Sequence, residues 1–85
     1  MKIVKTEDFI RAFEKLPKEI KHLYQTQEKR FKENWRDPRL HIRKVKTLKY
    51  AFSFRITRNY RVLFYFQDVE TAIFFEVGHR KETYR

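Results

Sequence analysis

The last eight residues of the sequence, GHRKETYR at residues 78–85, contain side chains that can bind phosphate and transfer protons. They follow residues 72–77, a largely apolar stretch that is typical of a buried strand. Upstream, Tyr60 and Arg61 begin a second stretch in which apolar residues alternate. Polar groups at the ends of such strands lie where a sheet stops, so we expect them to be accessible to a ligand.

These residue types suit phosphodiester chemistry on RNA. The guanidinium group of arginine donates paired hydrogen bonds to a phosphate, and tyrosine or histidine can transfer a proton. In RNA cleavage the 2′-hydroxyl of the substrate is itself the nucleophile. The protein has to orient that hydroxyl, stabilise the charged phosphorane and protonate the leaving 5′ oxygen.

Metal and nucleotide chemistry find little support in the sequence. His22, His41 and His79 are far apart and match no metal-ligand spacing, and the chain has no cysteine. Gly78 is the only glycine, so a glycine-rich phosphate loop is excluded. We therefore expect no metal and no cofactor. Because neither a membrane-length apolar stretch nor a signal peptide is recognisable, we expect a cytoplasmic protein.

The charge of the chain is concentrated in its middle. The net charge is +10, and residues 36–61 contain nine Lys or Arg residues but only one acidic residue, Asp37. Charge focused on one segment favours nucleic acid or an acidic protein as a partner. A solvated surface without a partner is the alternative reading.

Apolar spacing predicts one α+β domain over residues 1–85. A short strand at residues 2–5 precedes two helices, at residues 6–16 and 18–35, which Pro17 separates. Residues 39–49 form a basic loop that leads into a strand. Alternating apolar residues predict three strands, near residues 50–56, 60–66 and 71–77. The expected order is β-αα-βββ, with the αα-hairpin packed on one face of a twisted antiparallel β-sheet.

The loop between the first two of these later strands predicts their register. A loop formed by residues 57–59 places Ile56 opposite Tyr60 and Arg55 opposite Arg61. The large apolar residues then gather on the other face, under the helices, while Leu63 shares the arginine face. Two arginines that face each other repel, so this register indicates a binding site for an anion.

Three segments resemble the RelE/ParE toxin superfamily, and in particular its RelE-like mRNA interferase branch. They are KVKTLK at residues 44–49, FRITRNYRVLF at residues 54–64 and GHRKETYR at residues 78–85. The resemblance implies a toxin of a toxin–antitoxin pair, a ribosome-dependent and metal-independent endoribonuclease that cuts mRNA and inhibits translation. It also implies a cognate acidic antitoxin as partner.

The resemblance further implies roles for individual residues. Arg61 and Arg80 match the family's phosphate-binding arginines, and Tyr84 matches its near-terminal tyrosine. His79 stands where other members have lysine, so either His79 or Tyr84 would transfer the proton or stack on a base. Four more basic residues would hold the RNA backbone: Lys44, Lys46, Lys49 and Arg55.

Several alternatives remain open at the level of sequence. The superfamily includes ParE-like poisons of DNA gyrase, and a non-enzymatic RNA-binding module is a third possibility. Arg61 can instead pair with an acidic group at a strand end, and Arg80 can bind an acidic antitoxin. Tyr84 can simply pack its ring.

Overall fold

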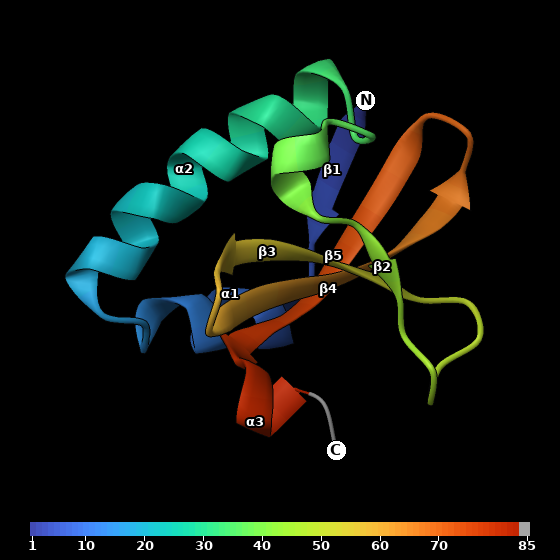
Figure 1. The fold of residues 1–85 in the computed structure, drawn as a ribbon. Coiled ribbons are helices and arrows are strands. Elements are labelled where there is room, and N and C mark those ends of the chain that lie inside the picture. Colours follow the sequence, from blue (N-terminus) through green and yellow to red (C-terminus); the bar gives the residue numbers. More distant parts are fainter. Residues whose placement is uncertain (84–85) are drawn as a thin grey trace.

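The computed structural model describes residues 1–83 and shows helices packed on one side of a β-sheet (Figure 1). The strands lie in the order β1-β5-β4-β3-β2. The elements, in chain order, are β1 (Lys2–Lys5), α1 (Glu7–Glu14), α2 (Lys18–Glu33), the 3₁₀ helix η1 (Pro38–Leu40), β2 (Arg43–Lys44), β3 (Phe52–Thr57), β4 (Tyr60–Asp68), β5 (Thr71–His79) and α3 (Arg80–Thr83). The predicted α+β fold, with an αα-hairpin on one face of the sheet, is confirmed.

The sheet is mixed, which corrects the prediction of an antiparallel sheet. Strand β1 pairs in parallel with β5, with Lys2 opposite Thr71. The remaining pairs of neighbouring strands are antiparallel. A parallel pair needs a long crossover connection, and α1 and α2 lie in that connection. In residues 1–83 no helix has the length and apolar character that a membrane span requires.

Local sequence signals explain the two long helices. The hydroxyl oxygen of Thr6 accepts a hydrogen bond from the Phe9 backbone amide at 3.1 Å, which caps α1. Glu7 and Asp8 lie in the first turn, where the helix dipole favours negative charge. Pro17 then separates α1 from α2. Helix α2 ends at Glu33, slightly earlier than predicted.

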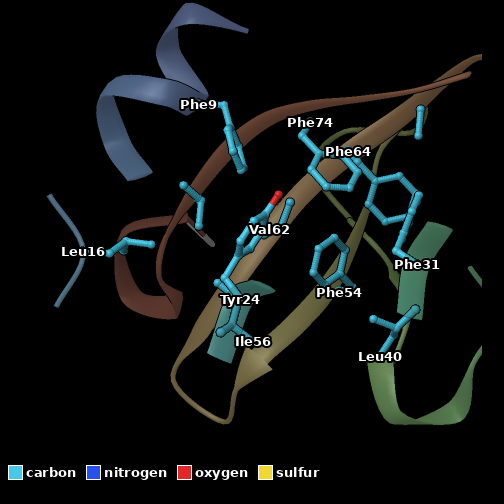
Figure 2. Close-up of a cluster of buried hydrophobic side chains, with 12 residues drawn as sticks. Phe9, Leu16, Tyr24, Phe31, Leu40, Phe54, Ile56, Val62, Phe64 and Phe74 are labelled. Carbon is cyan, nitrogen blue, oxygen red and sulfur yellow. The ribbon is translucent and has the colours of Figure 1, made fainter. Parts of the chain in front are cut away.

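A cluster of aromatic rings forms the core between the helices and the sheet (Figure 2). Phe31 of α2 lies at its centre, with ring centroids 4.9 Å from Phe64, 5.1 Å from Phe74 and 5.5 Å from Phe54. All four side chains are completely buried. Leu40 of η1 is also fully buried and covers the same cluster. The helices thereby seal one face of the sheet against water.

The β3–β4 hairpin has the predicted arginine pair, but its turn is shorter than the predicted one. Arg55 lies opposite Arg61, as predicted. The prediction that Ile56 lies opposite Tyr60 is wrong, because Thr57 occupies that place. A β-bulge between Arg55 and Thr57 absorbs the extra residue. The bulge lets a shorter turn join the strands while both faces keep their predicted side chains.

Candidate nucleic-acid interface

The face of the sheet opposite to α1 and α2, called here the open face, carries a row of arginines. Side chains alternate along a strand, so Arg55 and Arg61 point away from the aromatic core that their neighbours form. Arg43 of β2 pairs with Ser53, two residues before Arg55, and therefore lies on the same face. On the other side, Arg61 pairs with Gly78 of β5. Three neighbouring strands thus present arginines on one face.

Four arginines lie close enough to influence the charge of Arg55, and we call these five residues the arginine cluster. Burial lowers the pKa of Arg55, and the positive charges of Arg61, Arg43, Arg58 and Arg80 lower it further. The Arg55 Nε is buried and has no hydrogen-bond partner among residues 1–83. Like charges held together destabilise the charged state, and a bound anion relieves that repulsion. The members of the arginine cluster are Arg43, Arg55, Arg58, Arg61 and Arg80.

A backbone hydrogen bond brings Arg80 to this cluster. The Arg80 amide donates to the Asn59 carbonyl oxygen at 2.7 Å, which joins the start of α3 to the β3–β4 turn (Figure 1). Arg58 belongs to that turn. The hydroxyl of Thr83 donates to the His79 carbonyl oxygen at 3.4 Å within the short helix. The tertiary fold therefore unites two segments that are well separated in sequence.

Gly78 adds no side chain beside Arg61, and α3 packs over it. Its backbone does not adopt the left-handed conformation that would demand glycine. A Cβ at this position would lie 3.5 Å from Thr83 Cγ2 and 3.9 Å from Glu82 Oε2, which are ordinary contact distances. Alanine therefore fits here, whereas a longer side chain would occupy space next to Arg61 and α3.

Gln27 connects helix α2 to the backbone of the arginine strand. Its Nε2 donates to the Arg55 carbonyl oxygen at 2.6 Å and to the Arg39 carbonyl oxygen at 3.0 Å. Its Oε1 accepts from Arg30 Nη1 at 2.9 Å. The side chain is buried, and the Arg55 carbonyl lies at the bulge. The only signal of this role in the sequence is a polar residue that interrupts the apolar stripe of α2.

The structure places His79 on the helix-covered side of the sheet, away from Arg55 and Arg61. His79 pairs with Tyr60, and the two rings meet edge to face with centroids 5.3 Å apart. Its Nδ1 accepts from the Lys81 amide at 3.1 Å, so neutral His79 carries its proton on Nε2. The ring lines a cleft of about 550 Å³ that Arg11 and Lys15 also line. His79 is therefore not brought together with Arg55 and Arg61, and Tyr84 lies outside the described residues.

The predicted RNA-binding lysines do not all lie on the open face. Lys44 pairs with Phe52, whose ring packs against the helix-covered core, so Lys44 does not share a face with Arg55. Arg43, which the sequence prediction missed, occupies the open face instead. A strand of two residues is too short to show alternation in the sequence. Lys46 and Lys49 are exposed.

The loop that carries Lys46 and Lys49 is anchored on the open face. The Val45 amide donates to the Ala51 carbonyl oxygen at 3.0 Å, which closes the loop. Val45 and Ala51 are buried together with Leu63, an open-face residue of β4. A second, smaller apolar cluster thus fixes both lysines at the border of the open face.

Basic side chains outnumber acidic ones in this region, although Glu76 pairs with the open-face residue Leu63 and Glu82 lies near Gly78. The sequence contains no Asp or Glu from residue 38 to residue 67. Asp37 is engaged by Arg39, with Oδ2 and Nη2 2.7 Å apart, and this hydrogen bond lowers the Asp37 pKa to about 2. Within residues 1–83, no three His, Asp or Glu side chains are arranged to hold a metal ion. The open face is suited to binding an extended anion.

Comparison with known proteins gives matches among solved structures only. No protein-family model and no curated protein matches the chain. The RelB-RelE antitoxin-toxin complex from Methanococcus jannaschii matches with a TM-score of 0.76 at 23% identity, covering 95% of this chain and 94% of the other. The YoeB/ParE toxin from Agrobacterium tumefaciens matches with a TM-score of 0.76 at 14% identity, covering 93% and 98%.

A third match is the toxin-antitoxin complex RelBE2 from Mycobacterium tuberculosis, with a TM-score of 0.66 and an identity of 27%, higher than that of the other two. It covers 93% of this chain and 96% of the other. All three alignments span nearly the whole of both chains, so they compare complete folds. The resemblance that the sequence motifs indicated is confirmed for the architecture: this chain has the fold of the RelE/ParE toxin superfamily.

Proposed function

We propose that this chain is the toxin of a toxin–antitoxin pair and that it cleaves mRNA on the ribosome. The observation that carries the proposal is the arginine cluster on the open face, where the pKa of Arg55 is lowered by burial and by four surrounding guanidinium groups. Similarity to toxins and antitoxin–toxin complexes supports the toxin role. A cluster of this kind suits a phosphodiester whose charge increases in the transition state.

In the proposed mechanism the cluster holds the scissile phosphate. The 2′-hydroxyl oxygen of the RNA attacks phosphorus and passes its proton to solvent water, while the bond from phosphorus to the 5′ oxygen breaks. Arg55, Arg61 and Arg80 stabilise the negative charge that develops on the phosphorane oxygens. The leaving 5′ oxygen takes up a proton. We assign this proton to Tyr84, on the basis of the sequence motif, because His79 faces the cleft beside α1.

Removing single arginines tests the phosphate-binding role. Arg61→Ala and Arg80→Ala should each reduce single-turnover cleavage on programmed ribosomes by about a hundredfold to a thousandfold, the usual cost of one preorganised donor. Lys44→Ala, on the opposite face, is the matched control and should cleave nearly as fast as the unaltered chain. Intact transcripts together with collapsed DNA supercoiling would instead establish a ParE-like gyrase poison.

Two further variants test the proton transfer. Tyr84→Phe keeps the ring and loses the hydroxyl, so cleavage should fall strongly while RNA binding is unchanged. His79→Gln should leave the cleavage rate close to that of the unaltered chain. Strong loss in His79→Gln with normal Tyr84→Phe would reverse the assignment. Unaltered cleavage in both variants would leave catalysis to the arginines and to ribosomal groups.

We also propose an acidic antitoxin as the partner in the cytoplasm. A net charge of +10 would cause indiscriminate binding to nucleic acid at low salt, which an acidic chain can prevent by neutralising the basic surface. Co-purification should recover such a chain, and high salt should weaken the complex. A tight complex that is indifferent to salt would show that apolar docking dominates.

A further inference from the structure

Three aromatic rings lie together on the open face, apart from the main core. The ring centroids of Tyr50 and Tyr65 are 5.5 Å apart with the planes at 82°, and those of Tyr65 and Phe75 are 5.7 Å apart. Tyr50 is 59% exposed, while Tyr65 and Phe75 are partly buried. We call Tyr50, Tyr65 and Phe75 the aromatic patch. Its most exposed ring is thus supported by the other two.

The aromatic patch and the arginine cluster share one face of one strand. Arg61, Leu63 and Tyr65 alternate along β4, and all three lie on the open face. Four residues of an extended strand span about 13 Å, since each residue adds about 3.3 Å. Leu63, which lies between them, is buried under the loop of residues 45–51, so a single ligand that contacts both groups has to pass over this loop.

The surroundings of Tyr50 favour a negatively charged ligand. Tyr50 belongs to the same loop as Lys46 and Lys49, both of which are exposed. No acidic residue occurs from residue 38 to residue 67, and Glu76, which pairs with Leu63, is the acidic residue that β5 adds to this face. Exposed rings flanked by basic side chains suit unpaired nucleobases, because every base has a π-face and each base is attached to a phosphate.

We propose that the aromatic patch is a stacking site for unpaired bases of single-stranded RNA. The proposal rests on the proposed function and extends it. The arginine cluster holds one phosphate, and Tyr50 holds a base on the far side of the loop that covers Leu63. Stacking at Tyr50 would fix the position of the RNA relative to the cluster and would select single-stranded over double-stranded RNA, since paired bases have no free faces.

Binding of a fluorescently labelled, unstructured oligoribonucleotide, measured by anisotropy over a range of salt concentrations, tests this site. Tyr50→Leu should weaken binding by about fivefold to a hundredfold, the usual contribution of one stacked base. Tyr50→Phe should retain most of the affinity. Lys49→Ala is the electrostatic comparison and should make the salt dependence shallower by about 0.7 in slope, whereas Tyr50→Leu should leave the slope unchanged.

Three results would overturn the stacking site. They are wild-type affinity in Tyr50→Leu, equal affinity for a duplex of the same sequence, and loss of antitoxin capture by Tyr50→Leu with RNA binding intact. Cleavage assays on the same variants separate this site from the nuclease function. If the unaltered chain cleaves and Tyr50→Leu binds and cleaves equally well, the stacking site is refuted and the nuclease stands. If the unaltered chain binds RNA through Tyr50 without cleaving it, the stacking site stands and the nuclease function is refuted.

Discussion

The two faces of this sheet are built from the same strands but have opposite chemistry. On the helix-covered face Phe54, Phe64 and Phe74 are completely excluded from water. On the open face the alternate positions hold Arg55 and Arg61, which lie opposite each other although both are cationic. Because neighbouring side chains of a strand point to opposite faces, the pairing that builds the core also assembles the charge cluster.

The comparison shows how a small domain can tolerate clustered positive charge. Burying one large apolar side chain contributes about 1.5 to 3 kcal/mol, and contacts between aromatic rings add to this. Interactions between partly exposed charges are typically worth about 1 kcal/mol or less. The apolar face therefore offsets the repulsion on the other face.

The largest predicted effect comes from breaking the helix-covered face. Phe31→Ala removes a ring that contacts one phenylalanine from each of β3, β4 and β5, and it leaves a cavity. The free energy of unfolding should therefore fall by about 3 to 5 kcal/mol. Urea denaturation measures this loss. Val69→Ala, at an almost fully exposed position, is the control and should change little. A loss below about 1 kcal/mol for Phe31→Ala would mean that Phe31 is not central to the core.

A smaller effect is expected where the two faces are joined. Gln27→Met keeps the length of the side chain but removes the donors to the Arg55 and Arg39 carbonyl oxygens, so it should cost about 1 to 3 kcal/mol. Gln25→Met, at an exposed position of the same helix, is the matched control. Equal stability of the two variants would show that Gln27 does not hold the bulged strand.

On the open face, removing a charge should not lower the free energy of unfolding. Burial and four neighbouring positive charges lower the Arg55 pKa, and Arg55→Gln removes the charge that they disfavour, so stability at low salt should stay the same or rise by about 1 kcal/mol at most. Sulfate should raise the melting temperature of the unaltered chain more than chloride does at equal ionic strength, because sulfate binds the folded cluster. This extra stabilisation should shrink in Arg55→Gln. An equal sulfate effect in both chains would place the anion elsewhere.

The smallest predicted effect concerns an ion pair at the edge of the helix-covered face. Burial alone would raise the Glu28 pKa, but hydrogen bonds from Lys5 and Tyr24 bring it below its ordinary value of 4.5. The carboxylate therefore stabilises the fold above about pH 4.5, and this contribution is lost as the pH falls through the lowered pKa. Glu28→Gln should flatten the acid side of a stability–pH curve. An unchanged curve would show that this ion pair contributes nothing measurable.

The sequence by itself determined the longer elements and the two faces of the sheet, but it did not predict β2, η1 or α3. Helical spacing and Pro17 predicted the αα-hairpin, and alternation along residues 52–66 predicted which side chains enter the core. The arginine pair of Arg55 and Arg61 followed from the same alternation. These features depend on neighbours in the chain, so they can be predicted from local patterns.

Tertiary structure decided which separate segments meet, and with them the composition of the candidate site. The parallel pairing of β1 with β5, the contact of Arg80 with Asn59 and the bonds from Gln27 join residues far apart in sequence. The faces of Arg43, Lys44 and His79 followed from pairings that no local pattern shows. A shift of one residue moves a side chain to the opposite face, so strand ends and bulges are where sequence reasoning fails.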